Sequence, residues 1–482
     1  MLATLDGAER RRLTRFVEQI QFPGRLVQFP FVYFIRDGEW LHDEETFLQP
    51  EQPFRPDEPY GKHWNGNCDD CHTTAPSYGW DTDEELGQTT VTEIGIACEA
   101  CHGPGRAHVE RHRNPIIRYR AHLAGTPVDD IVNPAKLDAA RSASICARCH
   151  AELIEKEGPL PEHRPGQRIE QSAHVLRWRS RPYPEWLEAA IEDEPDLLRN
   201  TFWSDGTMRV AGRDYNALVE SACFQRGDLS CVSCHALHGD EPGDQLRPEA
   251  RGDGVCLSCH TEYGENLEAH THHPRSSEAS RCYSCHMPYT TWGLLGSIRA
   301  HRVDSPSVAA SITTDRPNAC NLCHLDRTLE EMADWLHVWY GQPKPELPEA
   351  QRRTAASIQW LLSGDAIQRA TLAWHMGYEP AKAASGDDWQ APFLAELLDD
   401  PYPVVRRRAF ESLSGYEAGR DLRYDFRAPS FRRRRLAAKV QARWHPRAGD
   451  RHAVLIRNGV LQLLEIAVLK ARRDDTPVLV AE

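Results

Sequence analysis

Cysteine and histidine recur along this chain in one spacing, Cys-x-x-Cys-His, which occurs seven times and uses fourteen of the fifteen cysteines. Two residues between the cysteines place both thiols on one side of a turn, where they can bond the two vinyl groups of haem. The histidine that follows then lies under the iron as an axial ligand. The spacing therefore predicts seven covalently bound haems of the c type. The predicted attachment residues and proximal iron ligands are Cys68, Cys71, His72, Cys98, Cys101, His102, Cys146, Cys149, His150, Cys231, Cys234, His235, Cys256, Cys259, His260, Cys282, Cys285, His286, Cys320, Cys323 and His324.

Three other uses of paired cysteines fit this pattern less well. Zinc ribbons use such pairs two at a time and need no histidine after each pair, so an odd number of copies is unexpected. A disulfide framework would not place every pair two residues apart, and a thioredoxin-like motif would occur once. Cys223 lies outside the pattern, and we interpret it as a small buried residue, with an iron ligand or a reactive thiol as the alternatives.

The second axial ligand of each iron decides its chemistry. Between residues 2 and 324 the only methionines are Met208 and Met287, so most irons must take a second histidine or stay open. Methionine raises the potential of a haem, and a mostly bis-histidine set therefore predicts low-potential electron transfer. The candidate distal ligands are His108, His238, His272, His273 and His301, with His112, His122, His174 and His270 ranked behind them.

Composition excludes several classes of protein. The net charge of -14 argues against nucleic acid as the main partner. The richest apolar stretch, residues 460–469, is interrupted by Gln462 and Glu465, so the chain as given has no transmembrane segment.

Haem is joined to such motifs outside the cytoplasmic membrane, which predicts export to the periplasm or outer surface of a bacterium. The first residues lack the apolar core of a signal peptide. We therefore expect a trimmed chain or a start codon placed too late.

The surrounding elements divide the chain into three predicted parts. Residues 1–60 form a β-prone lead, with strand-forming residues over 25–35 and a turn signal at Asp37-Gly38. Residues 61–324 form the haem domain, in which porphyrins replace an ordinary apolar core and short helices and loops wrap them. Residues 325–482 contain no cysteine and show helical patterning. The predicted fold is mainly α with little regular sheet.

Two stretches of residues 325–482, which we call the tail, share one sequence pattern. Each has a Leu-Leu pair at the end of one helix, a short turn, and a second helix that carries an arginine, Arg369 or Arg406. The offset of 36 residues predicts stacked helical hairpins of the HEAT-like kind. Residues 401–473 carry a net charge of +12. We interpret them as a solvated helix face or as a docking patch for an acidic redox partner.

Some segments resemble a known family. The segment Gly95–Gly105 with His108, the segment 229–239, and His272-His273 followed by the motif at 282–286 resemble bacterial multihaem cytochromes. This family includes cytochrome c nitrite reductase, the hydroxylamine oxidoreductases and the tetrahaem nitrification cytochromes. The resemblance covers about residues 25–330 and implies that a helical tail is a familiar appendage. It also implies a further haem module upstream of residue 25.

The resemblance leaves three functions open. We expect an exported cytochrome that passes electrons through a chain of haems between redox partners. The first alternative is an oxidoreductase that acts on a small nitrogen or sulfur compound at one open haem. Nitrite reductases of this family place lysine in one motif, whereas all seven motifs here end in histidine. The second alternative is a subunit of a conductive assembly, and the oligomeric state stays open.

Overall fold

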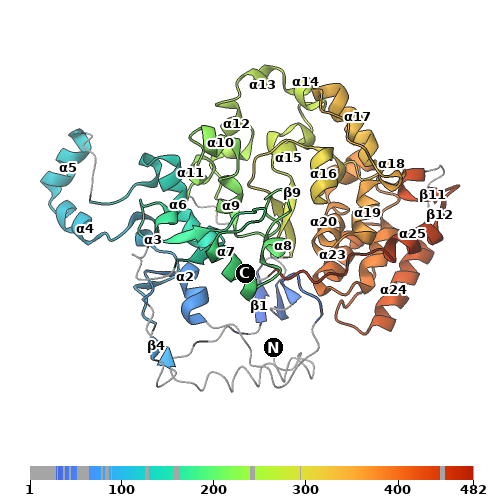
Figure 1. Ribbon diagram of the computed structural model, residues 1–482, viewed down its shortest axis with the longest axis horizontal. Coiled ribbons are helices and arrows are strands. Elements are labelled where there is room, and N and C mark those ends of the chain that lie inside the picture. Colours follow the sequence, from blue (N-terminus) through green and yellow to red (C-terminus); the bar gives the residue numbers. More distant parts are fainter. Residues whose placement is uncertain are drawn as a thin grey trace. The chain divides into compact units, whose positions relative to one another are not determined.

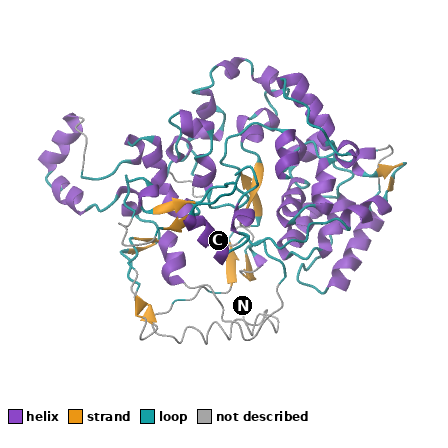
Figure 2. Ribbon diagram, in the orientation of Figure 1, coloured by secondary structure: helices purple, strands orange, loops and turns teal. Residues whose placement is uncertain are grey.

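The computed structural model describes residues 26, 29, 31–35, 38–42, 45–51, 64–77, 80–81, 86–87, 89–124, 130–156, 163–238, 245–293, 295–445 and 451–480. The first residues, where we expect no signal peptide, lie outside these ranges. Most of the predicted lead over residues 1–60 lies outside them too. The prediction of a mainly helical fold is confirmed (Figure 2). Sheet structure in the described part consists of six two-stranded antiparallel pairs.

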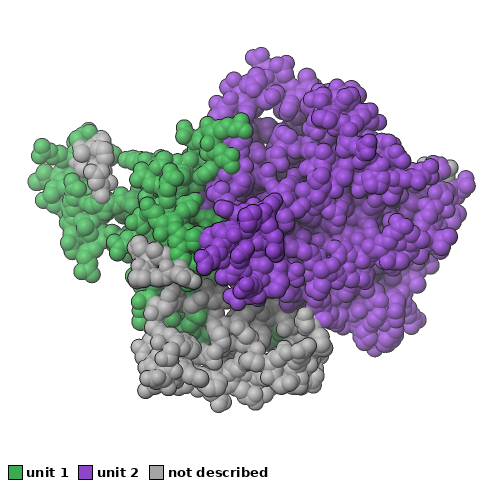
Figure 3. All heavy atoms as spheres, in the orientation of Figure 1, with its two compact units in different colours: residues 1–43, 53–176, 223–247 green, residues 44–52, 177–222, 248–482 purple. Residues whose placement is uncertain are grey.

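The chain divides into two compact units (Figure 3). Unit 1 contains residues 1–43, 53–176 and 223–247, and unit 2 contains residues 44–52, 177–222 and 248–482. The first four attachment motifs belong to unit 1 and the last three to unit 2. This division does not coincide with the boundaries predicted from the sequence, because residues 325–482 share unit 2 with three motifs.

Unit 1 consists of short helices and strand pairs (Figure 1). Its helices are α2 (Asp69–His72), α3 (Cys98–His102), α4 (Arg106–His112), α5 (Pro115–Ala124), α6 (Ala139–His150), α10 (Ala222–Arg226, whose first residue belongs to unit 2) and α11 (Cys231–Cys234), with shorter turns η2 (Trp64–Cys68), η3 (Pro134–Lys136) and η4 (Ile169–Gln171). Its strands are β1 (Phe31–Phe34), β2 (Glu39–His42), β3 (Thr73–Thr74), β4 (Trp80–Asp81), β5 (Leu86–Gly87), β6 (Glu93–Ile94), β7 (Leu153–Glu155) and β8 (Ala173–Val175).

Strands β1 and β2 form a hairpin in the stretch where the sequence favours strands. Phe31 pairs with His42, and Gly38 in the turn has a φ of +65°, a conformation that glycine adopts without steric cost.

Helix α6 is the longest of the helices described in unit 1, and it packs against α2 and α11. The Asp138 side chain caps its start by accepting a hydrogen bond from the Arg141 amide at 2.9 Å. Its buried residues include Ala143, Ser144 and Ala147, and small side chains of this kind allow neighbouring helices to approach closely. The helix ends at His150, so its last turn presents the third attachment motif beside the first and the fourth.

Unit 2 contains longer helices. They are α7 (Glu185–Asp193), α8 (Leu197–Thr201), α9 (Asp214–Leu218), α12 (Gly254–Leu257), α13 (Glu262–Glu265), α14 (Leu267–Thr271), α15 (Cys282–His286), α16 (Val308–Thr314), α17 (Leu329–Tyr340), α18 (Glu349–Arg353), α19 (Ala356–Ser363), α20 (Ala366–His375), α21 (Glu379–Ser385), α22 (Ala391–Glu396), α23 (Pro403–Ser414), α24 (Ser430–Arg443) and α25 (Leu463–Lys470). Shorter elements are η5 (Pro248–Arg251), η6 (Glu278–Ser280), η7 (Cys320–Leu322), η8 (Leu397–Asp399), η9 (His452–Val454) and strands β9 (Tyr289–Gly293), β10 (Gly296–Arg299), β11 (Ile456–Arg457) and β12 (Val460–Leu461).

The two stretches of the tail that share a sequence pattern form two helical hairpins, α19–α20 and α22/η8–α23. Helix α20 packs against α23. A buried ion pair joins them: Arg369 Nε lies 2.7 Å from Asp400 Oδ2, and both side chains are 0% exposed. The apolar core of unit 2 is centred here, with Leu361, Ile367 and Phe393 all fully buried. This part of the chain therefore has a conventional apolar core.

The tail is joined to the haem-bearing part of unit 2 at several points. His375 Nε2 donates to the Tyr289 carbonyl at 2.9 Å, and Gln368 donates to the Asp315 carbonyl at 2.6 Å. Asp365, which caps α20, also forms a buried ion pair with Arg209. Since charged groups are rarely buried without partners, these contacts tie α20 to residues far earlier in the chain.

Candidate haem-binding sites

Most attachment motifs lie on single helical turns, as their spacing requires. The second, third and sixth motifs lie wholly within α3, α6 and α15. The others lie at α2, α11, α12 and η7 and extend one to three residues beyond these elements. The seven proximal histidines are half-buried or exposed rather than sealed inside protein. Apolar residues beside the second and fourth motifs are also exposed, with Ile94 at 90%, Ile96 at 57% and Leu237 at 51%. Apolar surface beside an attachment motif is what a bound porphyrin would cover.

Three proximal histidines face a second histidine ring. The ring centroids of His102 and His238 are 5.9 Å apart, at an interplanar angle of 11°. His270 and His286 are 6.3 Å apart at 1°. Two imidazoles that share one metal through nitrogens about 2 Å away have centroids about 6 Å apart. The spacing in both pairs therefore fits a haem iron between the rings.

The third pair consists of His273 and His324, with centroids 5.9 Å apart at an angle of 33°. Burial, followed by the nearby His273 and Arg327, lowers the pKa of His324 to about 4. Its imidazole is consequently neutral at physiological pH, which is the form that binds a metal.

Backbone carbonyls orient one ring of each pair. His102 Nδ1 lies 2.6 Å from the Val132 oxygen, His286 Nδ1 lies 2.9 Å from the Asp304 oxygen, and His273 Nδ1 lies 2.6 Å from the Thr271 oxygen. A proton on Nδ1 that is donated to a carbonyl leaves Nε2 with a free lone pair. This arrangement is typical of histidines that bind metals, because it fixes both the tautomer and the ring orientation.

The predicted distal ligands fall into different settings. His238 and His273 face proximal histidines. His301 Nδ1 lies 2.9 Å from Asp214 Oδ1; burial opposes the charged form, but this contact outweighs it and raises the pKa of His301. The ring of His301 is not one of the three pairs above.

The structure places His108 and His272 beside other side chains. His108 Nδ1 lies 3.1 Å from Asp130 Oδ1, and the His272 ring stacks on Trp339 with centroids 4.1 Å apart. His270, which the sequence ranked behind His272, instead faces the proximal His286. His270 and His272 both lie shortly before Cys282 in the chain, at similar spacings. The sequence alone therefore does not indicate which of the two faces His286.

Neighbouring motifs adjoin within each unit. In unit 1, Cys149 Sγ lies 3.7 Å from the Cys71 oxygen, and the Cys146 thiol lies within hydrogen-bonding reach of Cys231. The third motif is thus next to the first and the fourth. Because its own motif supplies both contacts, α6 forms the centre of the four attachment sites of unit 1.

In unit 2 the contacts run in sequence order. The Cys256 thiol lies within hydrogen-bonding reach of Cys282, and Cys285 is close enough to Cys320 and Cys323 to raise the pKa of both thiols, after the larger effect of burial. The fifth motif therefore adjoins the sixth, and the sixth adjoins the seventh.

Cys223 is half-buried in α10 and lies outside the motifs. Its carbonyl oxygen lies 2.8 Å from the position that a Cβ on Gly227 would occupy, so Gly227 permits this close approach of the backbone.

The basic segment 401–473 is only partly exposed. Arg406 is 1% exposed and contacts Glu51 at 2.9 Å, while Arg407 and Arg408 both contact Glu411. Arg433 is buried and lies 2.9 Å from Asp399. These arginines are held by acidic groups of their own unit. The exposed cations of α24 are Arg432, Arg434, Arg435, Lys439 and Arg443.

One comparison with known families bears on the Cys-x-x-Cys-His motifs. Within the described residues no helix has the length and apolarity needed to cross a membrane. A family described as Doubled CXXCH motif matches residues 222–265, which hold the fourth and fifth copies. No curated protein matches the chain. A solved structure titled "Crystal Structure of Outer Cell Wall Cytochrome OcwA" is similar at 17% identity and a TM-score of 0.42, over 80% of this chain and 82% of that chain. The matched pair and the five further copies of its motif support a multihaem c-type cytochrome with covalently bound haem c.

Proposed function

We propose that this protein is an exported cytochrome that passes electrons between redox partners through seven haems, most of them held by two histidines. The observation that carries this proposal is the set of three histidine pairs that face each other at 5.9 to 6.3 Å beside attachment motifs. Bound haem supplies a reversible one-electron couple at its iron, and two imidazole ligands keep the potential of that couple low.

The side chains of each unit have three tasks in this function. The cysteines fix the positions of the porphyrins, and because neighbouring motifs adjoin, they bring successive cofactors close together. The paired histidines would hold an iron between them, which would leave small molecules no open site on that iron. The carbonyls of Val132, Asp304 and Thr271 hold the rings in place, which reduces the rearrangement that accompanies a change of charge.

The tail has a supporting role in this proposal. Its two stacked hairpins fit the HEAT-like repeat that the sequence predicts, and its contacts with residues 289–324 hold the last two motifs of unit 2. Export to the periplasm or cell surface follows from the attachment chemistry, which is carried out beyond the cytoplasmic membrane.

Axial substitutions provide the direct test. Replacing His238, His270 or His273 with alanine should convert one haem per chain from low to high spin, because each loss opens one axial position. Electron paramagnetic resonance and the optical spectrum of the oxidised protein would count the affected haems. His337→Ala is a matched control, since the ring of His337 bonds to the Gln342 carbonyl in the tail. An unchanged spin state in the three variants would remove the assigned ligand pairs and the proposal with them.

The number of haems is a second expected result. Intact mass should exceed the 54.7 kDa apoprotein by seven haem groups, because each of the seven motifs is complete. Cys231→Ser combined with Cys234→Ser should remove one haem and leave six, and a pyridine haemochrome assay would provide an independent count. Five or fewer haems in the unmodified protein would show that some motifs serve another purpose.

Partner docking is proposed for one face of α24. Arg432, Arg435, Lys439 and Arg443 are exposed and recur every three or four residues, which places them along one side of the helix. Arg433 is excluded from this stripe because Asp399 holds it. A row of cations suits an acidic redox partner, and such attraction mainly accelerates association.

Charge reversal of the stripe should slow electron delivery. Substituting Arg432, Arg435 and Lys439 with glutamate should lower the association rate with an acidic partner by about tenfold or more at low salt. Near 0.15 M salt the screening length falls to about 8 Å and the effect should shrink. Arg352→Glu, at an exposed position on α18, is the control. A rate that does not depend on salt, together with a lowered melting temperature, would mean that the stripe stabilises its own unit instead.

A further inference from the structure

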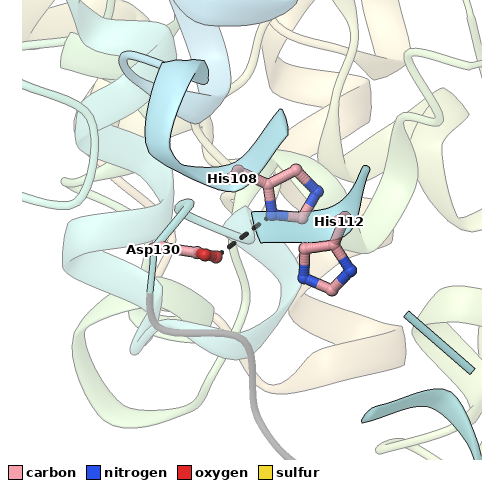
Figure 4. Close-up of side chains that lie close together, drawn as sticks. All are labelled: His108, His112 and Asp130. Atoms are coloured by element: carbon pink, nitrogen blue, oxygen red, sulfur yellow. Dashed lines mark hydrogen bonds and ion pairs between the residues drawn. The ribbon is translucent and has the colours of Figure 1, made fainter. Parts of the chain in front are cut away.

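Three side chains of unit 1 that can bind a cation converge beside the α4–α5 hairpin (Figure 4). His108 and His112 lie four residues apart on α4, so their rings project from the same face of the helix. Asp130 comes from the segment that follows α5. One donor atom from each of the three residues lies within 4.8 Å of the other two, and all three side chains are half-buried.

The contacts inside this cluster leave donor atoms available. His108 Nδ1 lies 3.1 Å from Asp130 Oδ1, and the two imidazole rings are 4.5 Å apart at an angle of 29°. His112 Nε2 is buried and has no hydrogen-bond partner among the described residues. A buried ring nitrogen without a partner loses the free energy of its bond to water, which binding a ligand would restore.

We propose that His108, His112 and Asp130 bind one divalent transition-metal ion, with Zn²⁺ as the reference case. Two imidazoles and one carboxylate are ligands that Zn²⁺ takes at about 2 Å, and three protein ligands leave one position for water. Nitrogen donors favour zinc, copper or nickel over calcium or magnesium, which prefer oxygen. The 4.5 Å spacing is also too short for the two rings to lie on opposite sides of one haem iron, unlike the pairs near 6 Å.

Arg111 is the feature that opposes a cation here. Its Nη1 atom lies 3.5 Å from Asp130 Oδ2, and its side chain is 50% exposed. The same carboxylate also lies 3.1 Å from His108 Nδ1, through its other oxygen. Arg111 and a bound metal would therefore compete for the same carboxylate, and removing the guanidinium should strengthen metal binding.

A metal in this cluster would join the segment after α5 to α4. The ion would then fix the base of a helical hairpin whose outer helix carries exposed apolar side chains, among them Ile116 and Leu123. This site does not depend on the electron-transfer proposal, because none of its residues belongs to the three facing pairs.

Zinc binding by the intact holoprotein tests the site. A chelator removes exchangeable metal while covalent haem keeps its iron, and zinc added afterwards can be counted against haem iron by mass spectrometry. We expect one zinc per chain. His112→Ala and Asp130→Asn should weaken its affinity by more than the roughly 10- to 100-fold that outer-shell substitutions cause. Arg111→Gln should strengthen it, and His122→Ala, an exposed histidine on α5, should leave it unchanged.

Three outcomes would overturn the proposal. The first is a protein that retains no stoichiometric zinc. The second is zinc binding that survives both His112→Ala and Asp130→Asn with unchanged haem spectra. The third is a conversion of one haem to high spin in His108→Ala, which would assign His108 to an iron. Because Arg111→Gln alters an exposed side chain, its effect on zinc affinity remains measurable even if the ligand variants fold poorly.

Discussion

Removal of residues 331–482 is expected to convert the haems of the sixth and seventh motifs from low to high spin. The deleted segment includes Trp335, which packs against the proximal His324 with centroids 5.2 Å apart, and Tyr340, which donates to the His270 carbonyl at 2.5 Å. It also includes His375, which holds β9 through the Tyr289 carbonyl. Without these contacts, nothing on the tail side keeps His270 and His273 opposite their partners.

The truncation also exposes a buried charge. Asp365 is the partner of Arg209, and both side chains are less than 10% exposed. Without the tail Arg209 loses this partner, and the surface of β9 that packs against α20 becomes exposed to water. The haem-bearing part of unit 2 should therefore unfold more easily, whereas the four haems of unit 1 should keep their spectra.

The spin state of the haems and the denaturation of the truncated chain would be compared with those of the full chain. An internal control is deletion of residues 471–482 alone, which leaves the three contacts made by Trp335, Tyr340 and His375 in place. A truncated protein with an unaltered spectrum would instead show that residues 325–482 form the separate domain that the sequence predicts.

Arg369→Ala is expected to destabilise unit 2 by about 3–5 kcal/mol, the range for breaking a buried ion pair from one side. Arg369 donates to both carboxylate oxygens of Asp400, at 2.7 and 3.2 Å, and to the Gly364 carbonyl at 2.8 Å. Removing the guanidinium leaves a fully buried carboxylate without its cation. The two hairpins of the tail would lose the group that joins them.

Matched variants separate this effect from the loss of any arginine. Arg353→Ala breaks an exposed pair with Glu349 and should cost no more than about 0.5 kcal/mol. Replacing Arg369 and Asp400 together with leucine should be less harmful than Arg369→Ala alone, because no charge is left buried. The midpoint of urea unfolding, followed by circular dichroism, compares the variants. Equal midpoints for Arg369→Ala and Arg353→Ala would show that the buried pair contributes little.

The attachment motifs can be read from the sequence because each consists of five consecutive residues. Which histidine ring faces a motif histidine depends on tertiary structure, and the three histidines at 270, 272 and 273 show why. His272 ends α14 in the left-handed conformation, with a φ of +56°, which turns the chain between its neighbours. His270 then faces His286, His273 faces His324, and His272 meets Trp339. A left-handed histidine is uncommon, and only the tertiary contacts select it.

Prediction from the sequence meets a similar limit in the tail. Its hairpins follow from local signals, the Leu-Leu pairs and the turns after them, and the structure contains both hairpins. The basic runs were harder to interpret, because a count of charges does not tell where each side chain points. Arg406 is buried against Glu51, a residue more than 350 positions away, whereas Lys439 is exposed. Burial of a charge depends on a distant partner, which composition cannot identify.

The path of the chain between the two units bears on how the protein matures. His238, which faces His102, is 136 residues later in the chain, after residues 177–222 of unit 2 have been made. His270 and His286 are only 16 residues apart. Each doubling of a loop adds about 0.6 kcal/mol to its closure, so the longer connection costs about 2 kcal/mol more. On the proposed ligation, the second haem of nascent unit 1 would lack its distal histidine until residue 238 has followed, about halfway along the chain, and His108 and His112 are the first histidines that come after its motif in the sequence.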